Sequence, residues 1–598
     1  MAQETTAPQI TQWQGGDDEQ ALLSTLSLDA PWQLVEEFGT RKYVRESGTE
    51  GEAQAVAAIT KRLTEWGIPF TVHHPRCWIS LPRGATVTVV LTDGTTRALP
   101  GTTPAFSIPT PTAGLTAPAF LLQAAHATSV GAIFTSGLGE VAQSDIVGKI
   151  IVLDSLPMPA RVGDLTRLGA TAAVFISPGD RVHEGICTPI WGTPDLDTVG
   201  ALPTLSVAEV NKIDGAWLKE QLAAGTVQSV TVHTKLDTGW REIPVTVAEI
   251  PGTQVPEEFV LVHGHLDSWG EGVGDNATGD ATLLELARGL WQNRAKLART
   301  VRVAWWSGHS HGRYAGSTWY ADNFGLDLIQ HCVAQVNCDS PGCRWATEYR
   351  DISWTPELGA FTQAVIRDVT GLPAHGERPP RAGDYSFNNL GLSGTLMLSS
   401  TMPDALRTEK GYYAVGGCGG NIAWHTVDDT MEIADRENLL RDIRVYGAVV
   451  WRLANAPVLP LDLVAAGEAI AAALAGYGES LGESFQLAPA QSAAAAFIAT
   501  AHAFAASAQA ADTRTGSALN AKMLRAVRHL TALSFAQRGH FRQEPALDVP
   551  ALPDLAAATR AILESPPESN TAGVAAVSLT RARNRATYAL IEAAHALA

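Results

Sequence analysis

The sequence predicts an α/β protein in which a mostly parallel sheet forms the central domain, joined by a β-rich insert and a C-terminal helical domain. Between residues 241 and 458, apolar strand-like runs alternate with helix-like segments, which is typical of a parallel sheet covered by helices on both faces. Short β-branched runs dominate from residue 77 to about 240, and none follow residue 460. Three regions with different patterns of strand-like and helix-like segments therefore follow one another along the chain.

The length of the chain supports this division. A chain of 598 residues is too long for one hydrophobic core. We expect a discontinuous central domain made of residues 1–81 and 241–458, an insert of residues 82–240, and a helical domain of residues 459–598. Hydrophobic residues make up 45% of the chain and charged residues 17%, so wholesale disorder is excluded.

The acidic charge balance excludes two classes of partner. Because the formal net charge is -18, nucleic acid and anionic membranes would be repelled over most of the surface. The N-terminal stretch has no basic region followed by an apolar run, and no later stretch is apolar for long enough to span a bilayer. The six dispersed cysteines have no CxxC spacing, which favours a cytoplasmic protein with reduced thiols.

Each region has its own element pattern. Residues 32–66 read as helical, with Val56, Ile59 and Leu63 on one face. The insert contains the strand-like runs GKIIVLD and TAAVFIS. In the central region, EEFVLVHGHLD precedes ATLLELARGL, and TVRVAWWS precedes STWYADNF. Beyond residue 460, Ala-rich segments such as LNAKMLRAVRHLTAL predict a bundle of packed helices.

Polar residues gather where the predicted strands end. In α/β sheets, ligands bind outside the carboxyl ends of the strands. One strand ends at His265 and Asp267, a Gly-rich loop then presents Asp275, the third strand is followed by Asp339, and a later loop carries His425. Imidazole and carboxylate groups suit zinc, which polarises a carbonyl or water. Asp275 is expected to bridge two metals, and Asp267 to hold the second nitrogen of His265.

These residues lie in motifs that resemble those of the di-zinc aminopeptidase and glutamate carboxypeptidase family: HxD at His265, DNATG from Asp275, NCD ending at Asp339 and HTVDDT from His425. The resemblance implies a hydrolase-like α/β domain, with His265 and Asp339 on one zinc, Asp275 bridging and His425 on the other zinc. The insert resembles a protease-associated domain. The helical tail resembles the dimerisation domain of transferrin-receptor relatives, which implies a homodimer.

One segment departs from the family pattern. Family members carry Gly-Glu-Glu after the tryptophan-bearing strand, where the first Glu is the general base and the second a zinc ligand. Here the sequence is Gly308-His309-Ser310-His311-Gly312. Three interpretations remain open: His309 or His311 supplies the ligand and moves protons; only one metal binds, and a histidine or a carboxylate such as Glu271 or Asp428 moves the proton; or the protein is an inactive binding scaffold.

The same five residues fit the serine nucleophile pattern G-x-S-x-G, with Ser310 followed in the chain by Asp339 or Asp384 and then His425. That alternative leaves the ordered histidine and aspartates of the first strand and its loop unexplained. It would make the protein a serine hydrolase rather than a metal enzyme.

We therefore expect a zinc-dependent hydrolase that cleaves a peptide or amide bond of a small substrate, using one or two zinc ions or another divalent metal. The expected metal ligands are His265, Asp275, Asp339, His425 and His309. Arg381 and Tyr385, in and just before GDYSF, are expected to line the substrate pocket. The candidates for catalytic roles are Asp267, His309, Ser310 and His311.

Overall fold

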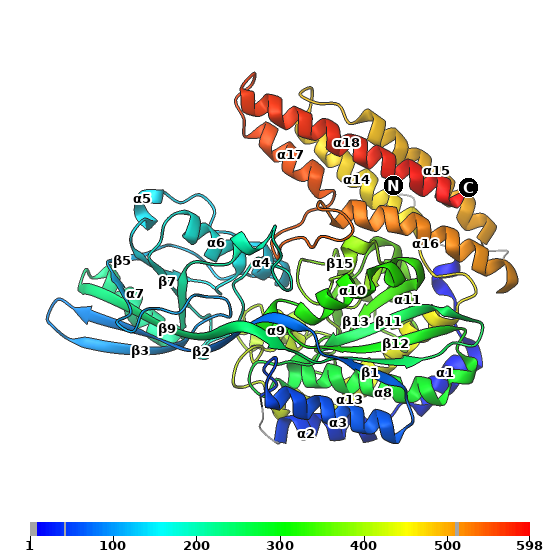
Figure 1. Ribbon diagram of the computed structural model, residues 1–598, viewed down its shortest axis with the longest axis horizontal. Coiled ribbons are helices and arrows are strands. Elements are labelled where there is room, and N and C mark those ends of the chain that lie inside the picture. The colour runs from blue at the N-terminus through cyan, green and yellow to red at the C-terminus, as the bar shows by residue number, and fades with distance from the viewer. Residues whose placement is uncertain (1–8, 41–43, 509–512) are drawn as a thin grey trace.

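A computed structural model describes residues 9–40, 44–508 and 513–598. The first eight residues of the N-terminal stretch, and residues 41–43 of the predicted helical segment, lie outside the described residues. The chain is mixed α/β with a helical C-terminal region, as predicted. A central sheet with its helices, a second sheet and a bundle of C-terminal helices occupy three regions of space (Figure 1).

The central sheet has six strands in the order β1-β10-β12-β11-β13-β16. Strand β11 is parallel to both of its neighbours, and β16 is parallel to β13, whereas β10 is antiparallel to β12 and to β1. The strands are β1 (Phe70–His73), β10 (Val245–Ile250), β11 (Val255–His265), β12 (Arg299–Trp306), β13 (Cys332–Asn337) and β16 (Gly394–Thr395).

The parallel register brings three chain segments to one edge of the sheet. His265, the last residue of β11, pairs with Trp306, the last residue of β12. On the other side, His263 of β11 pairs with Asn337, the last residue of β13. The residues that follow these three strands therefore emerge side by side, as the carboxyl ends of parallel strands do.

Helices cover both faces of this sheet because its strands are apolar on both sides. Val260 and Val262 pack into the larger core with helices α2, α3, α8 and α13, whereas Phe259 and Leu261 pack against α10 on the other face. Figure 1 shows the first group of helices below the sheet and α10 above it. The helices of this region are α1 (Gly16–Thr25), α2 (Asp29–Thr40), α3 (Glu50–Glu65), α8 (Thr278–Gln292), α10 (Ala315–His331), α11 (Pro356–Thr370), α12 (Asp404–Glu409) and α13 (Arg436–Asn455).

A buried ion pair attaches the N-terminal helix α1 to this core. Arg452 of α13 donates from Nε and Nη2 to the carboxylate of Glu19, at 2.8 to 3.1 Å. Its Nη1 donates to Asp368 of α11 at 2.8 Å. The guanidinium and the Glu19 carboxylate are both buried, so each depends on the other for its compensating charge.

Replacing Glu19 with Ala is expected to destabilise the protein by about 3 kcal/mol, because Arg452 would keep only one of its two charged partners in a buried position. The midpoint of the first urea unfolding transition, followed by tryptophan fluorescence, measures this change. Asp18→Ala is the control, since Asp18 forms an exposed pair with Lys296 and exposed pairs contribute little. Equal shifts for the two variants would contradict the prediction.

The insert is a second, eight-stranded sheet in the order β4-β9-β2-β3-β8-β7-β6-β5. Strands β2 and β9 pair from Arg76 opposite Glu242 to Leu91 opposite Val227, so they continue across the predicted boundaries at residues 82 and 240. The strands are β2 (Arg76–Leu91), β3 (Thr96–Thr102), β4 (Leu115–Ala117), β5 (Ala119–Leu121), β6 (Ile150–Asp154), β7 (Ala172–Ile176), β8 (Ser206–Val210) and β9 (Val227–Glu242). The helices are α4 (Val130–Thr135), α5 (Gln143–Ile146), α6 (Pro159–Arg167) and α7 (Lys212–Ala223).

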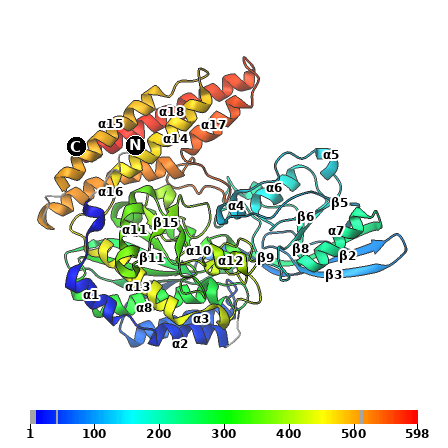
Figure 2. The ribbon, with the colours of Figure 1, turned by 180° about the vertical axis from the view of Figure 1, so that it is seen from behind.

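The C-terminal helices lie above the central region in both views (Figures 1 and 2). They are α14 (Leu463–Leu481), α15 (Ala488–Ala508), α16 (Thr513–Phe535), α17 (Pro553–Leu563) and α18 (Asn570–Leu597). The central region also contains a separate two-stranded sheet, formed by β14 (Tyr349–Ser353) and β15 (Ala374–Glu377). Arg528 of α16 attaches the bundle through bonds to the carbonyls of Ile329, Gly391 and Cys332. Within the described ranges, no helix combines the length and apolarity needed to cross a membrane.

Candidate metal centre

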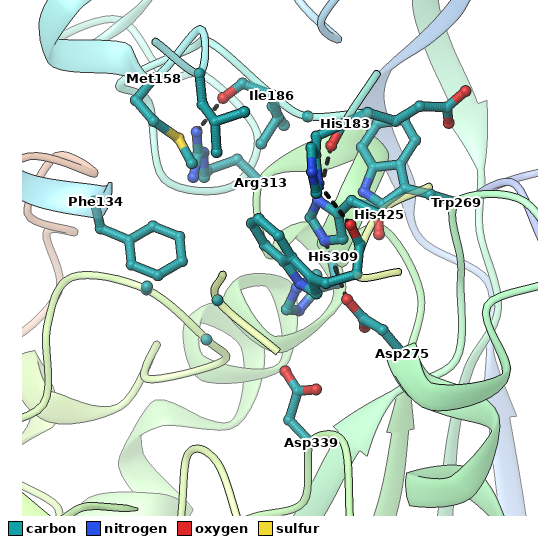
Figure 3. Close-up of a pocket in the computed structure, with 18 of the residues that line it drawn as sticks. Phe134, Met158, His183, Ile186, Trp269, Asp275, His309, Arg313, Asp339 and His425 are labelled. Carbon is teal, nitrogen blue, oxygen red and sulfur yellow. Dashed lines mark hydrogen bonds and ion pairs between the residues drawn. The ribbon is translucent and has the colours of Figure 1, made fainter. Parts of the chain in front are cut away.

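One carboxylate lies between two imidazoles at the carboxyl edge of the central sheet. His265 ends β11, and Asp275 lies in the turn Val273–Ala277 that follows. His265 Nε2 lies 2.8 Å from Asp275 Oδ1, and His425 Nε2 lies 3.1 Å from Asp275 Oδ2. Figure 3 shows Asp275 directed toward His425. Each carboxylate oxygen thus faces a different histidine, which is the arrangement of a bridging ligand between two cations.

Backbone carbonyls hold the other nitrogen of both imidazoles. His265 Nδ1 donates to the carbonyl of Asp267 at 2.8 Å, and His425 Nδ1 donates to the carbonyl of Glu184 at 2.7 Å. These bonds assign the proton to Nδ1 and leave the Nε2 lone pair directed at Asp275. Metal-binding histidines are usually oriented by such a bond from their second nitrogen.

A third imidazole joins His265 and Asp339. The ring of His309 stacks on that of His265, with centroids 3.7 Å apart and an interplanar angle of 18°. One ligand atom from each of His265, His309 and Asp339 lies within 4.8 Å of the others. His309 Nδ1 is 2.8 Å from Asp384 Oδ2, which leaves Nε2 for the cluster. Of the two histidines that the sequence left open, His309 is therefore the one that lies with the ligand set.

The donor set fits a zinc ion. His265 Nε2 and Asp275 Oδ1 are buried and face each other, yet neither forms a hydrogen bond of acceptable geometry within the described part of the chain. Buried polar atoms normally have a partner. Imidazole nitrogen and carboxylate oxygen are the donors that zinc takes at catalytic sites. A cation among these side chains would provide the missing partner.

Two residues that the sequence did not single out position these ligands. Asp429 accepts from the backbone N–H groups of Gly274 and Asp275, at 2.6 and 3.0 Å, and so fixes the turn that carries Asp275. Burial raises the pKa of Asp429 to about 7, although these amides oppose the shift. Asn276 donates to the carbonyls of His265 and Cys338 and thereby joins the ends of β11 and β13. Asn276 lies in the motif DNATG and Asp429 in the motif HTVDDT, so these motifs were the sequence signal that could have identified the two residues.

Asp267 does not hold His265 as predicted. The backbone carbonyl of Asp267 makes that contact, while its side chain accepts from the amides of His309 and Ser310, at 3.0 and 2.8 Å. The hydroxyl of Ser47 also donates to it. Because its carboxylate accepts from the first two amides of the short helix α9 (His309–Gly312), which follows β12, Asp267 caps that helix. The Asp267 side chain is fully buried. It positions the helix that carries His309.

Three other expected site residues point away from the ligands. His311 Nδ1 lies 3.1 Å from the hydroxyl of Ser47, and its ring packs on Trp269. Arg381 donates to the carbonyl of Glu544 and to the side chain of Gln543, and so attaches the C-terminal region. Tyr385 is fully buried and donates to the carbonyl of Ser353. The prediction that Arg381 and Tyr385 line the substrate pocket was wrong, because both are used in packing.

Ser310 is not built as a nucleophile. Its hydroxyl has no hydrogen-bond partner within the described residues, whereas a catalytic serine needs an imidazole within reach. Its backbone lies in helix α9 and has no positive φ, unlike the strained turn of a nucleophile elbow. His425, the base that this alternative requires, is instead bonded to Glu184 and Asp275.

Replacing Ser310 with Ala is therefore expected to leave zinc content unchanged and turnover within about threefold, since the hydroxyl has no hydrogen bond to lose among the described residues. A fluorophosphonate probe is expected not to label the native protein. Labelling at Ser310, together with loss of turnover in the variant, would instead identify a serine hydrolase.

A pocket opens beside the ligands (Figure 3). The insert contributes one wall, which includes Met158, His183 and Ile186, and the central region contributes Trp269 and Arg313. None of these five residues was predicted, because they come from loops without a periodic pattern. The lining also includes Phe134, Leu156, Glu184, Asp275, His309, Ser310, Tyr314, Asp339, Met397, Leu398, Trp424 and His425.

The carboxylates that the sequence offered as proton carriers lie elsewhere. Asp428 is about half exposed and pairs with Arg181 at 2.9 Å. Glu271 is not among the pocket residues. Glu184 of the insert is the pocket carboxylate outside the ligand set, and burial raises its pKa. His309 and Glu184 both line this pocket, whereas Glu271 and Asp428 do not.

Part of this chain is similar to known peptidases. Residues 246–450 match the family model of peptidase family M28. A probable glutamate carboxypeptidase, VP8, of Zea mays is 27% identical over 227 residues, which cover 36% of this chain and 31% of the relative. The chain thus spans under a third of that relative's length.

Two solved structures share the fold. An M28 peptidase precursor from Shewanella amazonensis is 20% identical and has a TM-score of 0.55 over 74% of this chain and 97% of its own. A zinc aminopeptidase from Bacillus subtilis is 18% identical and has a TM-score of 0.52 over 71% and 94%. The family match runs from β10 to α13 and contains all five of the residues expected to bind metal. Residues 246–450 of the α/β domain are therefore similar to peptidase family M28.

Proposed function

We propose that this protein is a zinc-dependent hydrolase of peptide or amide bonds. One observation carries the proposal: the two oxygens of Asp275 face two imidazoles, and each imidazole is fixed by a bond from its other nitrogen to a backbone carbonyl. The family match supports it, as does the likeness to a structure described as a zinc aminopeptidase.

In this proposal His265, Asp275, Asp339 and His425 hold the metal, and His309 takes the place of a family glutamate. Bound zinc supplies Lewis acidity, which polarises a carbonyl and makes water more acidic. The protein's own part is orientation: Asp267 fixes the start of α9, and Asp384 holds Nδ1 of His309 so that Nε2 faces the ligands. The apolar pocket walls exclude water from the reacting bond.

Metal removal tests the proposal directly. The purified protein, loaded with zinc, is expected to hydrolyse members of a peptide and aminoacyl-amide panel, to lose this activity after dialysis against 1,10-phenanthroline, and to regain it with added zinc. Zinc content is measured on the same samples. Hydrolysis that resists the chelator would contradict the proposal. Zinc binding without any hydrolysis would favour the inactive binding scaffold.

We also propose that the C-terminal helices pair two copies of the chain. Val574, Val577, Tyr588 and Ile591 of α18 are between 41% and 68% exposed. With 3.6 residues per turn, they share one side of the helix, opposite the side that packs into the bundle. An apolar stripe of this kind supports a partner surface.

Sedimentation velocity tests the dimer. The native protein is expected to sediment as a dimer at micromolar concentration, and the double variant Val577→Glu with Tyr588→Glu as a monomer, because charge on this face opposes burial. Val147→Glu, at an exposed apolar position of the insert, is the control and should leave the dimer intact. A monomeric native protein would refute the idea.

A further inference from the structure

The pocket beside the candidate metal centre has one cationic side chain. Its walls are otherwise dominated by apolar groups, among them Phe134, Met158 and Leu398, and Arg313 is the single Lys or Arg among the described residues that line it. Figure 3 places Arg313 with Met158 and Ile186 on one side of the pocket, and Asp275 and Asp339 on the other. A ligand in this pocket therefore meets both a guanidinium and the metal ligands.

The guanidinium of Arg313 is buried and has no carboxylate partner among the described residues. The residue is 3% exposed, and no Asp or Glu carboxylate in the described ranges forms an ion pair with it. Its Nη2 donates to the carbonyl of Ile186 at 2.5 Å, and the neutral hydroxyl of Tyr314 is a second hydrogen-bonding neighbour. Nε has no hydrogen-bond partner in the same ranges. A guanidinium has five N–H donors and stays charged when buried.

In another buried arginine of this protein, each of the three guanidinium nitrogens has a hydrogen-bond acceptor. Arg45 donates from Nε, Nη1 and Nη2 to the carbonyls of Leu266, Glu271 and Gly272, at 2.8 to 2.9 Å. A buried charge without such partners is costly. Arg313 lies directly after helix α9, which begins at His309, so its missing partner would bind next to the candidate metal centre.

We propose that Arg313 binds a carboxylate of the substrate, so that the site selects peptides or amides that combine a free carboxylate with an apolar side chain. The inference deepens the proposed function and rests on it, because it takes the bound carboxylate to belong to the substrate of that reaction. Carboxylates match the planar fork of a guanidinium and form the stronger, charge-assisted hydrogen bonds. The apolar walls accept the rest of the molecule.

Calorimetric binding of two probes tests the subsite independently of catalysis. N-acetyl-leucine carries the carboxylate and N-acetyl-leucinamide replaces it with a neutral group. The zinc-loaded native protein is expected to bind the acid about 10- to 100-fold more tightly than the amide. Arg313→Met should abolish this preference, Arg313→Lys should retain part of it, and Arg181→Met, at an exposed arginine paired with Asp428, should leave it unchanged.

Zinc content and the hydrolysis of Leu-Leu and its C-terminal amide complete the test. Arg313→Met is expected to keep native zinc content and to lose the preference for the free acid mainly through KM. Equal binding of acid and amide by the native protein, or a preference that survives in Arg313→Met, overturns the proposal. Arg313-dependent binding of the acid without hydrolysis of either peptide supports the subsite and counts against the proposed activity instead.

Discussion

Replacing Asp275 with Asn is expected to remove bound zinc and to lower turnover at least about 1,000-fold, since a metal supplies several kcal/mol of transition-state stabilisation. The physical reason is the position of its carboxylate, with one oxygen toward His265 and the other toward His425. An amide presents only one oxygen acceptor and no charge. Zinc content and the rate of peptide hydrolysis, measured on the same preparation, report the two effects.

A second readout separates metal loss from misfolding. Zinc stabilises a protein that binds it in the folded state only, so the native protein should melt at a higher temperature with zinc, whereas Asp275→Asn should melt at the same temperature with and without it. Asp428→Asn is the matched control, because Asp428 is exposed and pairs with Arg181. Native zinc content and turnover in Asp275→Asn would exclude it as a metal ligand.

The meeting of His265 and Asp339 at the candidate metal centre could be predicted because these residues lie at or just after the ends of regular strands. The strand and helix alternation predicts parallel strands, and parallel strands bring their carboxyl ends to one edge. His265 ends β11 and Asp339 follows β13, and these two strands pair in parallel register. The distance between them along the chain is therefore bridged by the sheet itself, whose geometry is known in advance.

The neighbouring loop shows why the rest could not be predicted. Arg381, Asp384 and Tyr385 are close in an irregular segment, and no periodicity tells which side chain faces the site. Asp384 accepts from His309, while Tyr385 turns into the core and Arg381 toward the C-terminal region. Burial acts to raise the pKa of Asp384, but the charge and hydrogen bond of His309 outweigh it, so this pKa lies below its usual value.

Contacts between the insert and the central region were also outside the reach of sequence patterns. The carbonyl of Glu184 holds Nδ1 of His425, although 241 residues separate them. The amide of Glu184 donates back to the carbonyl of His425 at 2.8 Å. A backbone carbonyl has no residue identity, so no motif marks it as part of a metal centre. The insert thus completes the site with atoms that every residue possesses.

His309→Ala is expected to lower turnover about 100- to 10,000-fold, the range over which proton-transfer and ligand-orienting groups act. Its ring stacks on His265 and lies with Asp339 in the ligand group. Zinc content distinguishes two roles for His309. If His309 is a metal ligand, its removal weakens zinc binding; if it only carries a proton, its removal leaves the zinc content unchanged. The geometry of the three-residue group favours the first result.

Two further variants make the His309 result specific. Asp384→Asn keeps the imidazole but removes the carboxylate that holds Nδ1, so it should cost about 10- to 100-fold, as loss of an orienting partner does. His311→Ala removes the adjacent histidine, which packs on Trp269 and lies near Asp267, and should lower stability while zinc content stays native. If His309→Ala kept zinc and turnover while His311→Ala lost both, the metal ligand would be His311. The hydrogen bond by which Asp384 orients His309 would then have no role in catalysis.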